Sequence, residues 1–186
     1  MHAEISKKLI TDIINGNKNA FSVIVNTYKN KIFRLCISHL KDPYLAEDTA
    51  QEAFIKIYTS LPTFKWKSSF STWVYSIAYF TCIDKLRKLS RKRADSLDWL
   101  REEKQLEIAD TREGNMPSRI ENTDLIRRVE KEMPAEYMSI LHLKFTHDFS
   151  LAEITGIMRT SADSVKSKLK RAKKKFIEIY RHFMQD

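Results

Sequence analysis

Apolar residues recur every three to four positions along most of this chain, and that spacing most constrains what it can fold into. Only three glycines and four prolines interrupt the 186 residues, and no sustained stretch alternates apolar with polar residues as a strand does. The sequence therefore predicts an all-α protein. Hydrophobic residues make up 42% of the chain, which is enough for packed cores, and the length allows one ordinary domain or two small ones.

Breaks in the helical pattern predict the ends of the helices. In the first half, helices are expected over residues 5–14, 21–41, 44–60 and 71–90. Proline disfavours helix in the residue before it, which ends the second helix ahead of Pro43. One face of that helix is predicted to be core: Phe21, Ile24, Tyr28, Ile32, Leu35 and His39.

The composition changes near residue 95 and indicates a linker. Between residues 95 and 124, nine acidic and four basic residues give a net charge of −5, and the apolar pattern thins around Gly114 and Pro117. We therefore expect domains over residues 1–93 and 122–186, joined by a linker over 94–121. Helices are expected in the second domain over about 123–132 and 134–147.

Cysteine and histidine give no sign of a metal site or cofactor. Cys36 and Cys82 lie in apolar, helix-like stretches and are expected to be buried thiols, with a disulfide or metal pair as the weaker alternative. The five histidines have no ligand-like spacing. We expect no cofactor, no metal and no small-molecule substrate. The N-terminus does not resemble a signal peptide and no apolar run is long enough to span a membrane, so the protein is expected in the cytoplasm.

The C-terminal part has the pattern of a helix-turn-helix. Ser150-Leu-Ala-Glu153 has the form of a capping box and opens a short helix. Arg159-Thr160-Ser161 breaks it, and a longer helix follows with Val165, Leu169, Ala172, Phe176 and Ile179 on its apolar side. Lysines and arginines on its outer side would neutralise DNA phosphates, and residues at its start would reach base edges. A solvated basic face on an ordinary helical hairpin is the alternative.

Aromatic residues gather in "FKWKSSFSTWVYSIAYF", residues 64–80, where seven of the chain's twenty aromatic residues lie among lysines. A basic run, "KLRKLSRKR", follows at once. Trp73, Ile77 and Phe80 are spaced to form a core stripe, and Phe70 to pack at the helix start, but core packing does not account for rings in a polar loop. Aromatic faces stack on unpaired bases while lysines follow phosphates, which favours binding of single-stranded DNA. A net charge of +9 agrees with a polyanionic partner, nucleic acid or an anionic membrane.

Three segments in order resemble one family. "KDPYLAEDTAQEAFIKIY", "FSTWVYSIAYFTCIDKLRK" and "EITGIMRTSADSVKSKLKRAKKKF" are similar to sigma-70 family transcription initiation factors of the small extracytoplasmic-function (ECF, group IV) type, from about Asn19 to Phe176. The resemblance implies a sigma-2 helical bundle and a sigma-4 helix-turn-helix. It implies a role as well: the protein binds core RNA polymerase and directs it to promoters, and polymerase, not this chain, does the chemistry.

The resemblance also implies partners and site residues. The partners are core RNA polymerase through its β′ clamp helices and β flap, promoter DNA, and a cognate anti-sigma factor, often membrane-bound. The β′ clamp helices would be contacted by Asp48, Gln51 and Glu52. The melted −10 element would lie near Trp66, Lys67, Ser69, Trp73, Tyr79, Phe80, Lys85 and Arg87. The −35 duplex would lie near Ser164, Lys166, Ser167, Lys170 and Arg171. The acidic linker would thread toward the polymerase active site and RNA exit channel, with an ordinary spacer as the alternative.

The sequence departs from the family pattern at several positions. Phe80 stands where asparagine is common, Thr155 where alanine is common, and Asp163 where glycine is common; Arg159-Thr160 replaces a frequent Gly-Ile pair in the turn. The base preferences of relatives therefore do not transfer to this chain. Two other functions fit parts of the sequence, a stand-alone helix-turn-helix regulator and a polymerase-binding regulator such as an anti-sigma or decoy protein. The first leaves the aromatic loop and the acidic patch unexplained, and the second does not need a basic recognition helix.

Overall fold

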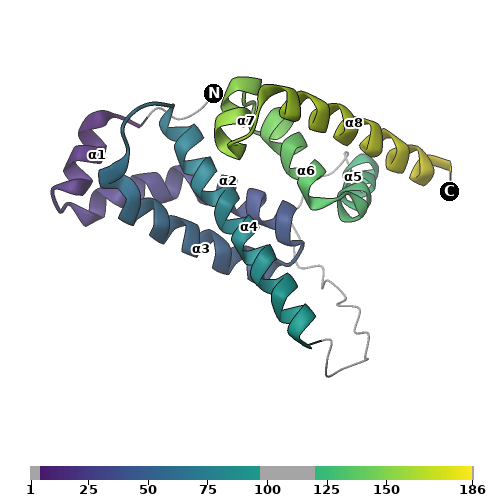
Figure 1. The fold of residues 1–186 in the computed structure, drawn as a ribbon, viewed down its shortest axis with the longest axis horizontal. Helices are drawn as coiled ribbons and strands as arrows, with labels where there is room; N and C mark the ends of the chain where they lie inside the picture. The colour runs from purple at the N-terminus through teal and green to yellow at the C-terminus, as the bar shows by residue number, and fades with distance from the viewer. Residues whose placement is uncertain (1–4, 97–119, 186) are drawn as a thin grey trace.

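The computed structural model describes residues 5–96 and 120–185, and every regular element in these two ranges is helical (Figure 1). The all-α prediction is therefore confirmed. The first module contains α1 (Lys7–Ile14), η1 (Lys18–Ala20), α2 (Phe21–Leu40), α3 (Pro43–Ser60), η2 (Leu61–Thr63) and α4 (Phe70–Ser96). The second contains α5 (Ile120–Glu132), α6 (Ala135–Leu141), the π-helical η3 (His142–Thr146), α7 (Leu151–Met158) and α8 (Ala162–Gln185). Residues 94–96 of the predicted linker continue α4 and residues 120–121 begin α5, while the rest of the linker lies outside the described residues.

The helix ends follow from local chemistry that the sequence shows. Ser6 caps α1 by accepting a hydrogen bond from the Leu9 amide at 3.2 Å. Between α2 and α3, Lys41 takes a left-handed conformation (φ 59°) and Asp42 then caps α3, accepting from the Leu45 amide at 2.8 Å. Each such cap contributes about 1 kcal/mol to helix stability. The predicted ends of the first four helices are thus confirmed to within a few residues, except that α4 continues to Ser96.

The core of the first module lies between α2, α3 and α4. The predicted stripe on α2 is confirmed, since Ile24, Tyr28, Ile32 and Leu35 are buried and Phe21 is partly buried. Fully burying a side chain of this size contributes roughly 1.5–3 kcal/mol. Tyr28 also keeps its hydroxyl paired, at 2.7 Å from Ser71 Oγ on α4.

The predicted core stripe on α4 is wrong by one residue. Val74, Ala78 and Cys82 are fully buried, while Trp73, Ile77 and Phe80 are only partly buried. A rotation of about 100° per residue explains the error, because a neighbouring stripe carries smaller side chains that fit closer to α2 and α3. Phe70 is buried at the start of the helix, as predicted.

The two cysteines are buried thiols, as predicted. Cys82 Sγ lies 3.4 Å from Cys36 Sγ and donates a hydrogen bond to it, across the contact between α4 and α2. That hydrogen bond, together with burial, raises the pKa of the Cys82 thiol. Both side chains are fully enclosed, so they pack as small apolar groups.

The second module forms the predicted helix-turn-helix. The capping box is present: Ser150 Oγ accepts from the Glu153 amide at 3.2 Å, and Glu153 Oε2 accepts from the Ser150 amide at 2.9 Å. Arg159 ends α7 in a left-handed conformation (φ 48°), and Ser161 Oγ caps α8 by accepting from the Ser164 amide. The predicted apolar side of α8 faces inward, with Val165, Ala172 and Ile179 buried and Leu169 and Phe176 partly buried.

The two modules pack directly on each other, which the sequence did not predict. Helix α7 lies along the first half of α4, and α6 lies against α2 (Figure 1). The second half of α4 projects past the second module. Among the helices that the structure describes, none combines the length and the apolarity needed to cross a membrane.

Candidate nucleic-acid interface

The aromatic loop before α4 presents a tryptophan to solvent. Trp66 is 38% exposed and has a left-handed backbone (φ 57°), an uncommon conformation for a large side chain. Its ring lies 4.8 Å from the ring of Phe64, and Lys7 Nζ lies 5.5 Å from its centre. Lys65 and Lys67 on either side are exposed. A ring beside several cations matches what single-stranded DNA binds.

Behind the loop, further rings support Trp66. Phe64 lies between Trp66 and Trp73, at 5.0 Å from the latter, and both Phe64 and Trp73 are partly buried. Ser69 accepts a hydrogen bond from the Thr72 amide at 3.1 Å and so caps α4. Of the residues expected near the −10 element, this loop therefore brings together Trp66, Lys67, Ser69 and Trp73.

Farther along α4, two of the expected site residues are not freely exposed. Tyr79 is only 6% exposed, and its ring meets that of His39 edge-on at 5.3 Å. Burial raises the pKa of Tyr79 to about 12, so the phenol stays protonated. Phe80 is partly buried under the guanidinium of Arg159, which lies 4.8 Å from the ring centre. The second module thus reaches Phe80 through Arg159, whereas the ring neighbours of Tyr79, His39 and Phe80, belong to the first module.

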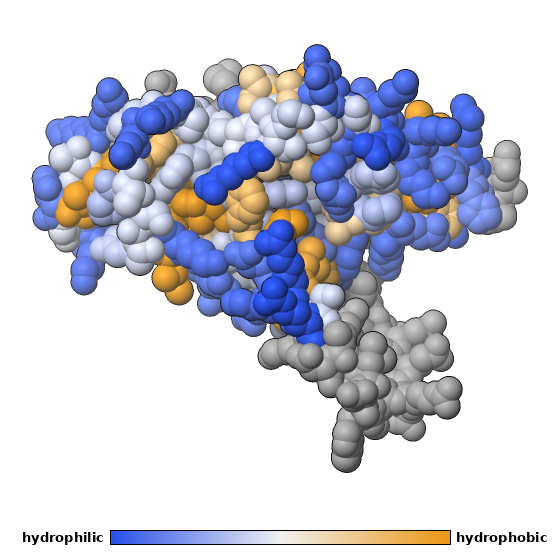
Figure 2. Space-filling model, in the orientation of Figure 1, coloured by the Kyte–Doolittle hydropathy of each residue, from blue (hydrophilic) through white to orange (hydrophobic). Residues whose placement is uncertain are grey.

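The second half of α4 is basic and open. Arg87 is exposed and has one ion pair, to Asp84 at 3.6 Å; Lys85 is partly exposed. Surface pairs of this kind contribute little, so Arg87 remains available to a phosphate. Figure 2 shows hydrophilic residues gathered along this projecting part of α4 and along α8.

Helix α3 carries the expected polymerase-binding residues on one exposed side. Asp48 and Gln51 are exposed, and Glu52 is partly exposed, with one carboxylate oxygen 2.8 Å from Lys56 Nζ. The hydrogen bond from Lys56 lowers the pKa of Glu52, which keeps this carboxylate ionised. The three residues form a compact acidic and amide patch.

Sequence reasoning missed two apolar residues beside this patch. Tyr44 is 84% exposed and Ile55 is 64% exposed. They stand four residues before Asp48 and four residues after Gln51, so the helix repeat places all four on one side of α3. Exposed apolar residues within a polar patch are typical of a protein-binding surface. A scan for apolar residues outside the core stripe would have found them.

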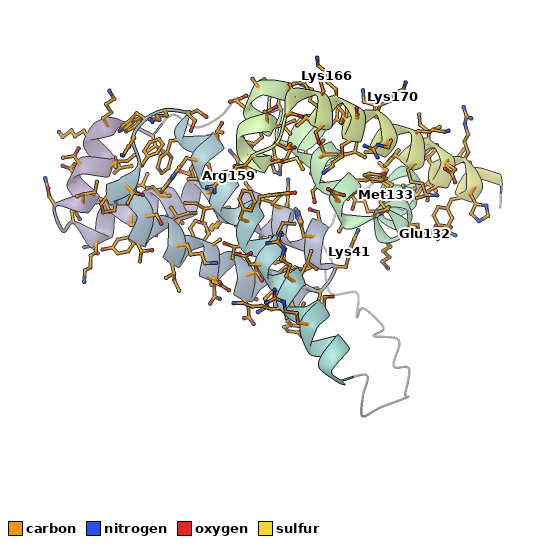
Figure 3. All side chains as sticks on the ribbon, in the orientation of Figure 1. Lys41, Glu132, Met133, Arg159, Lys166 and Lys170 are labelled. Carbon is orange, nitrogen blue, oxygen red and sulfur yellow. The ribbon has the colours of Figure 1, made fainter. Side chains whose placement is uncertain are left out.

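The recognition helix α8 is open along its basic side. Lys166, Ser167, Lys170 and Arg171 are exposed and Ser164 is partly exposed. Figure 3 shows Lys166 and Lys170 pointing away from the rest of the protein. The only recorded partner of Lys166 among the described residues is Asp163, at 3.8 Å. All five residues expected near the −35 duplex thus lie on one accessible helix start.

Among the described residues, no group of histidine, cysteine and carboxylate side chains is arranged to hold a metal ion. The arrangement consists of two helical modules, one with an aromatic and basic strand-binding surface and one with a basic recognition helix. This combination suits a protein that contacts both opened and closed DNA.

Family models match both modules. Residues 24–92 match sigma-70 region 2, and residues 124–176 match sigma-70 region 4. The chain is 33% identical to the ECF RNA polymerase sigma factor SigW of Bacillus subtilis, over 90% of this chain and 92% of that protein. It is 28% identical to the ECF RNA polymerase sigma-E factor of Escherichia coli K12, over 89% and 88%. The chain belongs to the ECF family of RNA polymerase sigma factors, non-enzymatic proteins that direct promoter-specific transcription initiation.

Solved structures share the fold. The sigma factor RpoE from Bartonella quintana, crystallised with the anti-sigma factor NepR, has a TM-score of 0.69 at 19% identity, covering 87% of this chain and 96% of its own. CnrH, solved with the cytosolic domain of CnrY, has a TM-score of 0.61 at 16% identity, covering 94% and 96%. The predicted family and function are therefore confirmed, and the stand-alone regulator and decoy alternatives are set aside.

Proposed function

We propose that the first module binds the separated strand of the −10 element through the aromatic loop and α4. The observation that carries this proposal is Trp66, an exposed ring with a left-handed backbone, flanked by two exposed lysines and backed by Phe64. Base stacking on such a ring contributes about 1–3 kcal/mol per base. Lys85 and Arg87 continue the positive charge along α4 for the phosphates. Phe80 would join this surface only after Arg159 of the second module has moved away, and Tyr79 would also have to leave its contact with His39 of α2.

The second module is proposed to read the −35 duplex with the start of α8. Ser164, Lys166 and Ser167 lie where a recognition helix meets base edges, and Lys170 and Arg171 lie one turn on, where phosphates run. The exposure of this helix side supports the assignment. We also propose the division into residues 1–93, 94–121 and 122–186, which agrees with the bounds of the two family matches.

Binding to core polymerase is assigned to α3. Asp48, Gln51 and Glu52 would contact the β′ clamp helices, and the exposed Tyr44 and Ile55 give that polar patch an apolar border. Contact of the second module with the β flap is proposed from the family resemblance. Because the proteins with this fold were solved with anti-sigma partners, we propose that this chain also has one, and that it acts in the cytoplasm, where polymerase and promoters are found.

The test is reconstitution with core polymerase. Asp48→Ala with Gln51→Ala is expected to lower co-purification with core polymerase by about tenfold, because residues at the centre of an interface carry most of its energy. The matched control, Asp12→Ala with Asn26→Ala, removes one acid and one amide elsewhere on the same module. Equal retention of the two variants on polymerase would argue against α3 as the contact.

A further inference from the structure

The contact between the modules is made by polar and aromatic side chains. Tyr75 on α4 places its hydroxyl 2.9 Å from His147 Nδ1, and its ring meets that of Phe149 edge-on at 4.7 Å. On α2, His39 Nε2 lies 2.8 Å from Ser139 Oγ of α6. Lys41 Nζ donates to the backbone carbonyl of Glu130. Each of these contacts joins residues from different modules.

Helix α7 reaches α4 closely because of a glycine. A Cβ atom at Gly156 would lie 3.3 Å from Thr72 Cγ2, tighter than ordinary van der Waals contact. Glycine inside a helix destabilises that helix relative to alanine. The close approach of α7 to α4 therefore explains why Gly156, which disfavours its own helix, stands at this position.

The covered side of α4 differs from its core side. The core side carries small apolar residues such as Val74 and Ala78, whereas the covered side, which meets the second module, carries Tyr75 and Phe80, with Ser76 on the same side of the helix repeat. Rings and hydroxyls at this spacing are suited to stacking on bases and hydrogen bonding to them. The second module therefore covers the same side of α4 to which strand binding is assigned.

Two departures from the family pattern meet in this contact. Arg159 replaces glycine in the turn between α7 and α8, and Phe80 replaces asparagine on α4. In the structure the guanidinium of Arg159 lies 4.8 Å from the centre of the Phe80 ring, within range of a cation–π interaction (Figure 3 shows Arg159 beside α4). A single pairing thus accounts for both unusual residues.

The interface is also built so that it can separate. Ser76 Oγ is buried on the covered side and has no hydrogen-bond partner among the described residues. Leaving a buried hydroxyl unpaired is unfavourable, and this cost is recovered when the interface opens to water or to a ligand. Meanwhile α8 and the α3 patch remain exposed, so DNA or polymerase can engage the closed molecule.

We propose that this closed arrangement is an autoinhibited state of the free chain. The second module masks the strand-binding side of α4, with Arg159 held against Phe80 and His147 against Tyr75, and separation of the modules on polymerase exposes it. This inference rests on the proposed function of α4. It adds that the protein restrains itself, before any partner binds, in part through Arg159 and Phe80, the two departures from the family pattern that meet in this contact.

The first experiment locks the modules together. Thr72→Cys with Gly156→Cys places two thiols across the closest approach of α7 and α4, and oxidised glutathione converts them to a disulfide by exchange. We expect the cross-linked full chain to lose at least about tenfold in run-off transcription with core polymerase, and reductant to restore it. The native chain, treated in the same way, controls for Cys36 and Cys82.

Either of two outcomes would overturn the proposal. Failure of the disulfide to form would show that the helices do not meet in solution, and undiminished transcription by the cross-linked chain would show that closure does not inhibit. If the reduced variant transcribes normally, the proposed function holds whatever the cross-linked form does, so the two ideas fail separately.

The second experiment forces the modules apart. Gly156→Gln favours its own helix but brings its Cβ to 3.3 Å from Thr72 Cγ2, so that Thr72 must shift, whereas the control Ala152→Gln lies one turn earlier on the same helix at an exposed position. Dyes on Asn30→Cys and Glu178→Cys report the distance between the modules in the full chain, since Cys36 and Cys82 are enclosed. Only Gly156→Gln is expected to lengthen that distance, and to raise affinity for single-stranded oligo(dT) by about tenfold.

An unchanged distance in Gly156→Gln would refute closure through α7. A longer distance without tighter oligo(dT) binding would show that α4 is uncovered but is not a strand-binding surface, which counts against masking and against the assignment of α4 together. Circular dichroism and thermal unfolding of both glutamine variants establish that each module is folded.

Discussion

The two candidate DNA-binding surfaces differ in chemistry, and the difference explains why one is covered and the other is open. The start of α8 presents lysines and serines, which are well solvated and attract DNA from a distance. The covered side of α4 presents Tyr75 and Phe80, which would leave an apolar patch on the free protein. A charged surface is stable when it is exposed to water, whereas an aromatic surface is more stable when another part of the protein covers it until its ligand binds.

The largest effect is expected at the open surface. Lys170→Ala with Arg171→Ala should weaken duplex promoter binding by the polymerase holoenzyme roughly a hundredfold at low salt, because each of these side chains contributes a charge-assisted phosphate contact. The slope of log affinity against log salt should fall by about two. Fluorescence anisotropy over a salt series measures both. The exposed pair Lys29→Ala with Lys8→Ala, which removes the same charge from the first module, controls for net charge; an equal loss there would indicate a purely global effect.

Acid is expected to open the covered surface. Burial is the main cause that lowers the pKa of His39 from 6.5 to about 4; His142 and Lys41 also lower it, while its hydrogen bond to the Leu35 carbonyl and the charge of Glu136 raise it. Because the closed state disfavours protonated His39, its stability is fully present above pH 6.5 and is lost as pH falls toward 4.

The expected size of this pH effect is at most about tenfold in the closed-to-open ratio per pH unit over that range. The two-dye distance measured from pH 7.5 to about pH 5, a range set by ordinary histidine titration, follows it. Of the neighbours from other helices, Tyr79 stays neutral in this range, so His39→Gln should flatten the response. A profile identical in His39→Gln would assign the response to another group.

The aromatic loop gives an effect of intermediate size. Trp66→Ala should reduce binding of single-stranded oligo(dT) by the opened Gly156→Gln chain about tenfold, whereas Trp66→Phe should retain most of it, because a phenyl ring still stacks. The comparison is matched, since both replacements keep a side chain on the same left-handed backbone. Equal losses in the two variants would point to the indole nitrogen or to the loop conformation instead of stacking.

The smallest effect concerns the pairing of Arg159 with Phe80. Asparagine tolerates a left-handed backbone, so Arg159→Asn removes the cation while leaving the turn unstrained. It should raise the open fraction about two- to fivefold, as expected for an exposed cation–π contact. A double-mutant cycle with Phe80→Leu, read out by the two-dye distance, measures the coupling; strictly additive effects would mean that the two side chains do not interact.

Local sequence signals predicted most of the fold. The capping box at Ser150 and Glu153, the end of α2 ahead of Pro43, and the apolar repeat of α8 each depend on residues within four positions of one another, and all are found as predicted. The exposed side of α8 followed from the same repeat. Such features can be derived from one sequence because helix geometry fixes which neighbours meet.

Local sequence patterns could not predict the contact between the two modules. His39 and Ser139 are 100 positions apart, and Tyr75 and His147 are 72 apart, so no local pattern links them. Histidines without ligand spacing were interpreted only as surface or core residues. The left-handed backbone of Trp66 was also not predictable, because that conformation favours glycine or asparagine and is imposed here by the packing of the loop.

Gly156 lowers the stability of helix α7, but it allows the close packing of the modules that keeps the free protein inactive. Alanine at this position would strengthen α7 by about 0.5–1 kcal/mol, so a screen for heat resistance would favour it. The added methyl group would press on Thr72 and loosen the docked state. Laboratory selection for a higher melting temperature would therefore also tend to raise background transcription.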